Sequence, residues 1–203
     1  MTTMTSTRVT AALQQAIRDA QPIFRGLVDA ISHPARPVRL DATVVDLPAV
    51  IVPAAVLADV TSRVALIGPS DIIQPIGDAL VRVTGCQLSE PADADLVIST
   101  TDLDSHMLGS LRRGTPAAPE TAATVFISCN EIQGTTHATE FTARGPGAHD
   151  GRRCTVSGID TALSWMVTQP NDFPCGIDIF IISADSSILA IPRSNRVTLT
   201  GGV

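Results

Sequence analysis

Arginine is the residue type in this sequence with the clearest capacity for chemistry. All 14 basic residues are arginines, from Arg8 to Arg196, and the chain contains no lysine. Without a lysine amine, the chain cannot hold pyridoxal phosphate as a Schiff base or place an ammonium group in a Walker A loop. A guanidinium group can instead bind phosphate or phosphonate oxygens through its planar fork, and it stays charged when partly buried. The basic residues therefore favour anion binding over lysine-based catalysis.

Arg193 is the strongest candidate for an anion-binding arginine. It closely follows the predicted apolar strand 188–191, a rigid position from which to present a guanidinium group, and the next two residues are a serine and an asparagine. A structural role has equal weight, in which Arg193 pairs with a carboxylate such as Asp178 or Glu120 and fixes a loop. The sequence leaves both roles open.

Glu120 is the carboxylate whose setting is most restricted. It ends the proline-bracketed segment 115–120, which we expect to be a stiff loop. A lone carboxylate in such a loop is more often a surface residue than a general acid or base. We therefore keep Glu120 as a candidate ligand-binding residue and assign no catalytic residue.

The spacing of histidine and cysteine predicts no metal site. His137 and Glu140 are three residues apart on a predicted strand, which would point their side chains to opposite faces. His149 and Asp150 are expected in a solvated, glycine-rich loop. The cysteines form no CxxC pair, and we interpret them as buried thiols in a reducing cytoplasm. They are Cys86, Cys129, Cys154 and Cys175.

Other catalytic motifs are weak or missing. The glycines at 145, 147 and 151 resemble a phosphate-binding loop only loosely, because their spacing differs from GxGxxG and no strand-to-helix turn frames them. The sequence has no GxSxG motif, and its four scattered histidines indicate no partner for a nucleophilic serine. We therefore do not expect the chain alone to be a hydrolase.

The composition indicates a protein that meets partners through a weakly charged surface. Charged residues make up 17% of the chain, below the usual value of about 25%, so more of the surface must be apolar or weakly polar. The net charge of -6 and the pI near 5.0 argue against binding to nucleic acid or anionic lipid.

No targeting or membrane segment is expected. The first residues lack a basic flank followed by an apolar core, so no secretory signal is predicted. The longest apolar stretch, 47–57, contains Pro48 and Pro53 and is much shorter than the roughly 20 residues of a membrane helix. We expect a soluble, cytoplasmic protein.

The first half of the chain has an α/β pattern. Apolar residues at helical spacing run from Leu13 to Ile31, and a break near Asp19 and Pro22 should divide this stretch into two helices. The second helix should end at His33. Further helices are predicted at 54–59, 71–83 and 105–112, and buried strands at 64–67 and 95–99.

The second half is predicted to contain more strands. The last two should form a hairpin around the turn 184–187, with Pro192 after the second strand. The strands are expected at 124–128, 137–142, 177–182 and 188–191, with one helix at 160–168. Together the elements predict one α/β domain over residues 1–203, with a mixed sheet.

Several short stretches carry a family likeness. They are FRGL at 24–27, AISHP at 30–34, GTP at 114–116, APE at 118–120, AT at 123–124, FPCGID at 173–178 and LAIPR at 189–193. In this order they resemble the H subunit family of the bacterial carbon-phosphorus lyase system. The last two stretches are the most specific, whereas 53–104 is similar only in its pattern.

This resemblance implies a subunit of a phosphonate-degrading complex with G, I and J subunits. With G and I, and helped by the L protein, the family participates in displacing adenine from ATP by an alkylphosphonate, which yields a ribose 1-phosphonate 5-triphosphate. Cleavage of the carbon-phosphorus bond belongs to the J subunit. The implied fold is similar to that of pyridoxal phosphate-dependent transferases, without the cofactor, and a homodimer is expected for the isolated chain.

Two hypotheses follow for this subunit. In one it is mainly a structural and assembly subunit that docks its partners. In the other it contributes phosphate-binding groups to a shared site that contacts ATP or phosphonate. The candidate substrate-binding residues are Arg193, Arg25, Glu120 and Asp178.

Overall fold

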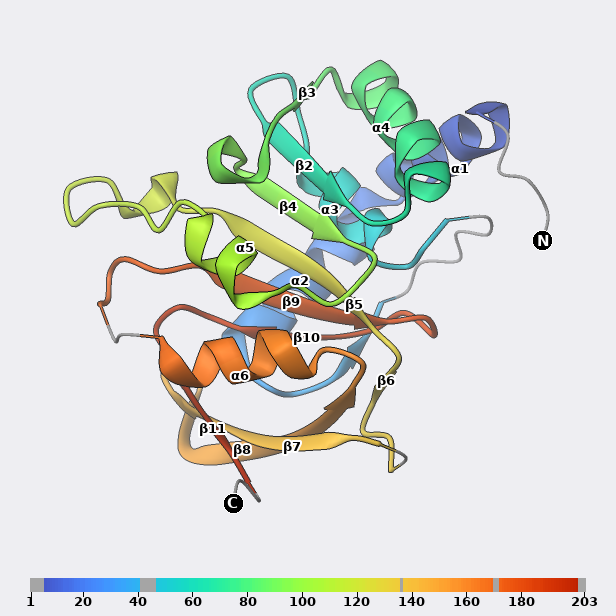
Figure 1. The fold of residues 1–203 in the computed structure, drawn as a ribbon. Coiled ribbons are helices and arrows are strands. Elements are labelled where there is room, and N and C mark those ends of the chain that lie inside the picture. The colour runs from blue at the N-terminus through green and yellow to red at the C-terminus, as the bar shows by residue number, and fades with distance from the viewer. Residues whose placement is uncertain (1–5, 41–46, 136, 170–171, 201–203) are drawn as a thin grey trace.

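The computed structural model describes residues 6–40, 47–135, 137–169 and 172–200, which form one α/β domain (Figure 1). A large mixed sheet runs through the centre of the molecule. Four helices cover one of its faces, and two helices with a smaller sheet cover the other. The predicted single α/β domain with a mixed sheet is therefore confirmed.

The large sheet has seven strands and both parallel and antiparallel pairs. Four successive pairs from β3 to β9 are parallel, and β10 pairs antiparallel with β9 and β1. In spatial order the strands are β1 (Val38–Arg39), β10 (Ser187–Ile191), β9 (Asp178–Ser183), β5 (Thr124–Cys129), β4 (Leu96–Ser99), β2 (Arg63–Ile67) and β3 (Gln87–Leu88).

One face of this sheet is covered by the N-terminal helices. Their apolar stripes pack on alternate strand residues, including the stacked rings of Phe126 and Phe180, whose centroids are 5.0 Å apart. Pro22 is tolerated because it lies in the first turn of the second helix, as predicted. The helices are α1 (Ser6–Arg18), α2 (Ala20–Ser32), α3 (Ile51–Leu57) and α4 (Ser70–Thr84).

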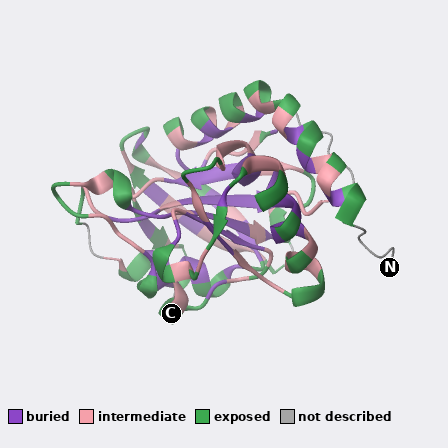
Figure 2. Ribbon diagram, turned by 90° about the horizontal axis from the view of Figure 1, so that it is seen from above, coloured by how far each residue is buried: buried purple, intermediate pink, exposed green. Residues whose placement is uncertain are grey.

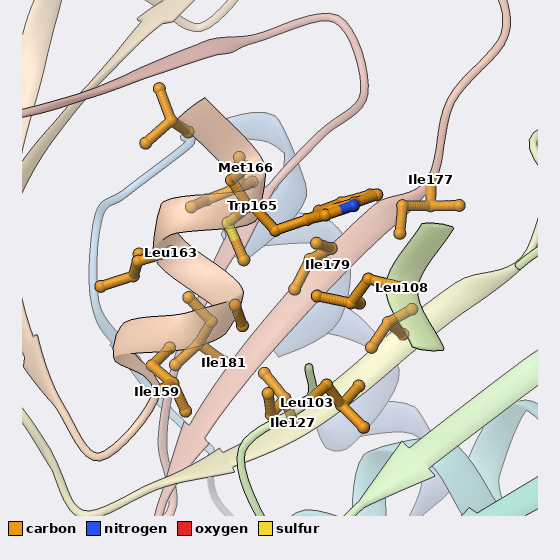
Figure 3. Packing of buried hydrophobic residues seen from close by; sticks show 14 of the residues in the cluster. Leu103, Leu108, Ile127, Ile159, Leu163, Trp165, Met166, Ile177, Ile179 and Ile181 are labelled. Atoms are coloured by element: carbon orange, nitrogen blue, oxygen red, sulfur yellow. The ribbon is translucent and has the colours of Figure 1, made fainter. Parts of the chain in front are cut away.

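The opposite face carries two helices and a four-stranded antiparallel sheet. Figure 3 shows apolar side chains of both helices packed against the strand residues Ile127, Ile179 and Ile181. The elements are α5 (Ser105–Ser110), α6 (Asp160–Thr168), and, in sheet order, β11 (Arg196–Leu199), β7 (Thr139–Gly145), β8 (Ala148–Ser157) and β6 (Glu131–Ile132). Two short 3-10 turns, η1 (Pro91–Asp93) and η2 (Pro119–Thr121), are the remaining elements of the described residues.

Burial follows these layers. In Figure 2, buried residues are concentrated in the central strands, while the outer sides of the helices are exposed. Among the residues that the structure describes, no helix combines the length and apolar character needed to cross a bilayer.

The small sheet corrects part of the sequence prediction. His149 and Asp150 lie in β8 and not in a solvated loop, because Pro146 and Gly147 form the tight turn of a hairpin that pairs β7 with β8. Polar residues are so frequent in β8 that its sequence shows no clear alternation of apolar and polar side chains. Strand β11 was not predicted for the same reason, since it is short and only Val197 within it is fully buried.

Several boundaries also differ from the predictions. Helix α3 begins at Ile51 because Pro53 is accepted in its first turn, and α5 ends at Ser110, four residues before Gly114. His137 has a positive φ of 49° and precedes β7, so it does not share a strand with Glu140.

Candidate functional site

The Arg193 guanidinium forms a close ion pair with the Asp178 carboxylate. Arg193 Nη2 donates to Asp178 Oδ2 at 2.6 Å, and Nε lies 3.1 and 3.2 Å from the two carboxylate oxygens. The Arg193 backbone N–H also donates to Asp178 Oδ1 at 2.8 Å. The side chains are only 15% and 18% exposed, so little water screens the pair.

The β9–β10 hairpin explains why these two residues meet. Ile179 pairs with Ile191 near the open end of the hairpin, which places Asp178, the first residue of β9, beside Arg193, two residues after β10. Pro192 lies between the strand and the arginine and ends the ladder, as predicted. The register of the hairpin therefore brings Arg193 and Asp178 together.

Arg193 also fastens a third segment to this hairpin. Its Nη1 donates to the Pro119 backbone oxygen at 2.7 Å, and the Gly176 N–H donates to the Arg113 oxygen at 2.8 Å. Gly176 has a φ of 132°, and a Cβ there would lie 2.9 Å from Arg193 Cβ. The segments around residues 114–120, 173–178 and 189–193 thus converge on one arginine.

The other two predicted ligand-binding residues lie apart from this pair. Glu120 is exposed in η2, and within the described part of the chain it forms no ion pair, so it does not supply the carboxylate for Arg193. Arg25 is exposed on α2, on the face of the large sheet covered by the N-terminal helices, beside Phe24 and Val28. The four predicted residues do not form one site.

A cavity next to Arg193 brings together residues that the sequence did not single out. Its volume is about 50 Å³, and it lies between the large sheet, the end of α6 and the start of β11. Three arginines line it, and none of the lining residues is acidic. The polar and reactive lining residues are Arg113, Gln169, Cys175, Arg193, Asn195 and Arg196.

The three arginines of this cavity differ in the groups that their side chains contact. Arg193 is paired with Asp178, and Arg113 donates from Nη1 to the side-chain oxygen of Gln169, a neutral group. Arg196 is exposed on β11. Within the described ranges, neither Arg113 nor Arg196 has a carboxylate oxygen within 4.0 Å. The cavity therefore carries uncompensated positive charge in a chain of net charge -6.

A second arginine cluster along the same edge of the sheet is structural. Asp95, just before β4, accepts from the Arg63 side chain and backbone and from Arg112. The two arginines link the starts of β2 and β4 to the segment after α5. These ion pairs connect the ends of neighbouring strands to a nearby segment. We therefore interpret the cluster as structural and assign no ligand to it.

The cysteines are largely buried, as predicted. Burial raises the pKa of the Cys129 thiol to about 12 and that of Cys154 to about 11. Cys86 is also buried, whereas Cys175 is only half-buried and lines the cavity. No group of three or more histidine, cysteine or acidic side chains in the described residues is placed to hold a metal ion.

The fold and the site define a class of protein. It is a single-domain α/β protein in which an arginine ion pair holds a strand hairpin and in which further arginines line a small cavity. Residues 11–198 match the family described as bacterial phosphonate metabolism protein (PhnH), so the chain belongs to this family. A comparison with curated proteins gave no match. Family membership shows that the protein is involved in bacterial phosphonate metabolism, as the sequence resemblance indicated.

Proposed function

We propose that this protein is a subunit of the carbon-phosphorus lyase core complex. In that complex it participates, with the G and I subunits and the L protein, in converting ATP and an alkylphosphonate into α-D-ribose 1-methylphosphonate 5-triphosphate and adenine. The observation that carries this proposal is the family match over residues 11–198. The J subunit is a further partner, and the chain is a transferase component only as part of this assembly.

The proposal includes a fold related to pyridoxal phosphate-dependent transferases, without the cofactor. The absence of lysine supports the proposal that the cofactor is missing, because no side chain of this protein can form an internal aldimine with pyridoxal phosphate. We also propose that the isolated chain forms a homodimer and that the protein is cytoplasmic. A native mass spectrum of the purified chain measures the dimer directly, and a monomer at micromolar concentration would contradict it.

Helix α2 supports an assembly role. Phe24 and Val28 are 50% and 46% exposed on its outer side, where they line a surface groove with Arg25 and His33. Large apolar side chains that remain exposed side by side often mark contacts between proteins. The low charge content of the chain is consistent with such a contact. We place the contact with the other subunits at this groove.

Reconstitution tests the function. The G and I subunits and the L protein are supplied with ATP and methylphosphonate, with and without this chain, and adenine and the ribose phosphonate are measured. We expect product only when the chain is present. Equal rates without it would refute the proposed function.

A substitution in the groove tests the assembly role. Phe24→Ser should weaken incorporation into the complex while leaving the melting temperature of the chain nearly unchanged, because the side chain is already half exposed. Val60→Ser is the matched control, since Val60 is 67% exposed and lies outside the groove. Native mass spectrometry of the mixed subunits reports incorporation, and full incorporation of the Phe24 variant would remove α2 from the interface.

A further inference from the structure

Two of the three arginines that line the cavity at the start of β11, Arg113 and Arg196, form no ion pair within the described residues. Arg113 and Arg196 reach it from segments 83 residues apart, the first from the stretch after α5 and the second from the small sheet. Two arginines that line one cavity repel each other unless an anion lies between them. The side-chain nitrogens of the neutral lining residues Gln169 and Asn195 donate to the Trp165 and Pro146 oxygens, so the arginines are the groups left to bind an oxyanion.

The neighbouring carbonyl groups do not oppose an anion strongly. The cavity adjoins the last turn of α6, where the helix end is electronegative. The Trp165 oxygen accepts from Thr168 and Gln169 side chains, and the Met166 oxygen accepts from the Gln169 N–H. These carbonyls are therefore already satisfied by the helix and its cap.

The size of the cavity limits what it can hold. A single water needs roughly 10 to 15 Å³ of such space, so about 50 Å³ accommodates a few waters or one tetrahedral oxyanion. A nucleoside triphosphate does not fit. The rest of a larger ligand would have to extend outside the cavity, past the exposed side chain of Arg196.

We infer that this cavity is a binding site for one tetrahedral phosphorus oxyanion, held by Arg113 and Arg196. Arg193 completes the wall but keeps its pairing with Asp178, so it is a positioning residue in this site. The inference rests on the proposed function for its ligand class, since a phosphonate or a terminal phosphate of the nucleotide has this chemistry. The substrate-binding arginines are then Arg113 and Arg196, and not Arg193.

The chain contains its own reporter for this site. Trp165 is the only tryptophan and lies in the wall of the cavity, next to Ile177 and Ile179 (Figure 3). Its fluorescence is followed while the full-length chain is titrated with methylphosphonate or with inorganic tripolyphosphate. Sodium chloride at matched ionic strength controls for screening. We expect a saturable change with at least one of the two probes and none with chloride.

The variants Arg113→Gln and Arg196→Gln test the assignment. Each removes charge-assisted hydrogen bonds, so each should weaken binding by about tenfold or more. Arg8→Gln is the matched control, because Arg8 is an exposed arginine on α1, far from the cavity. Arg196 is exposed, so its variant tests the inference even if the Arg113 variant does not fold.

Protection of Cys175 from alkylation provides a second measurement. This half-buried thiol lines the cavity, so a bound oxyanion should slow its reaction with iodoacetamide in the wild type but not in the Arg196 variant. Preferential binding of methylphosphonate identifies a phosphonate site, and preferential binding of tripolyphosphate identifies a nucleotide phosphate site; both support the inference. No saturable binding of either probe, or equal affinity in the arginine variants, would overturn it. That result would leave the proposed function standing if the reconstituted reaction still requires the chain.

Discussion

At the scale of single residues, Arg193 is bound within the protein. The Asp178 carboxylate and the Pro119 carbonyl occupy donors on all three of its side-chain nitrogens. Of the two roles that the sequence left open, the structural one has direct geometric support. Arg193 links the segments around residues 114–120, 173–178 and 189–193, and their fixed positions shape the adjoining cavity.

Removal of this ion pair should destabilise the protein. Arg193→Ala leaves the Asp178 carboxylate largely buried without its cation, at a cost of about 2 to 3 kcal/mol, or a melting temperature lower by roughly 4 to 12 °C. Arg153→Ala, at an exposed arginine on β8, should change stability little. Thermal unfolding of both variants is the measurement. A normal melting temperature for Arg193→Ala together with lost product formation in the reconstituted complex would favour substrate binding by Arg193.

The thiols should differ sharply in reactivity. Because only the thiolate is nucleophilic, the raised pKa values of Cys129 and Cys154 make both inert near pH 8, and Cys86 is shielded by burial. Iodoacetamide should therefore add one group to the folded chain, at Cys175, and four after denaturation in urea. Peptide mass spectrometry locates the adducts. Rapid modification of Cys129 or Cys154 in the folded chain would contradict the burial described here.

At the scale of elements, the helix α6 depends on a residue from another segment. Its own N-cap residue, Ile159, supplies no side-chain acceptor, and instead Asp102, after β4, accepts from the backbone N–H groups of Thr161 and Ala162. The capping carboxylate is thus 59 residues away from the helix in sequence. Helix start signals in sequence consider only adjacent residues, so this cap could not be predicted.

Asp102→Ala should weaken α6. The loss of the carboxylate that accepts from two backbone N–H groups at a helix N-terminus costs about 1 to 2 kcal/mol. Asp150→Ala is the matched control, because Asp150 is exposed on β8 and its side chain makes no hydrogen bond among the described residues. Urea denaturation followed by Trp165 fluorescence compares the two. Equal midpoints for both variants would show that α6 does not need this cap.

At the scale of the whole molecule, the composition leaves few groups that titrate in alkali. The chain has no tyrosine and no lysine, so the four cysteines are the only side chains that ionise between about pH 8 and pH 12. The pKa values of Cys129 and Cys154 are higher in the folded chain than the ordinary value of 9.0. Above pH 9 the unfolded state therefore binds fewer protons than the folded state.

Stability should consequently fall at alkaline pH. The contribution of these two thiols is fully present below pH 9 and is lost as pH rises, by up to about 1.4 kcal/mol per pH unit for each thiol, until they ionise in the folded chain near pH 11 and 12. Unfolding free energies from urea titrations at pH 8, 9 and 10 measure the slope. In the double variant Cys129→Ala with Cys154→Ala the slope should nearly vanish, and an unchanged slope would refute this origin.

The sequence by itself determined the chemical exclusions and most of the architecture. The missing lysine needs no structure to rule out an aldimine in this chain, and the period of apolar residues predicted the two N-terminal helices and the C-terminal hairpin correctly. These properties depend on residue type and on neighbours within a few positions. Strand β8 was missed because its exposed polar residues mask the alternation of its buried ones.

Only the tertiary structure decided which arginines are free to bind an anion. Arg113 and Arg196 line the same cavity because α5, α6 and the small sheet pack on one face of the large sheet, and no local sequence pattern encodes that arrangement. Asp178 and Glu120 were equal partners for Arg193 in the sequence, but hairpin register places only Asp178 within reach. Charge pairing depends on distances between segments, and those distances are set when the layers pack.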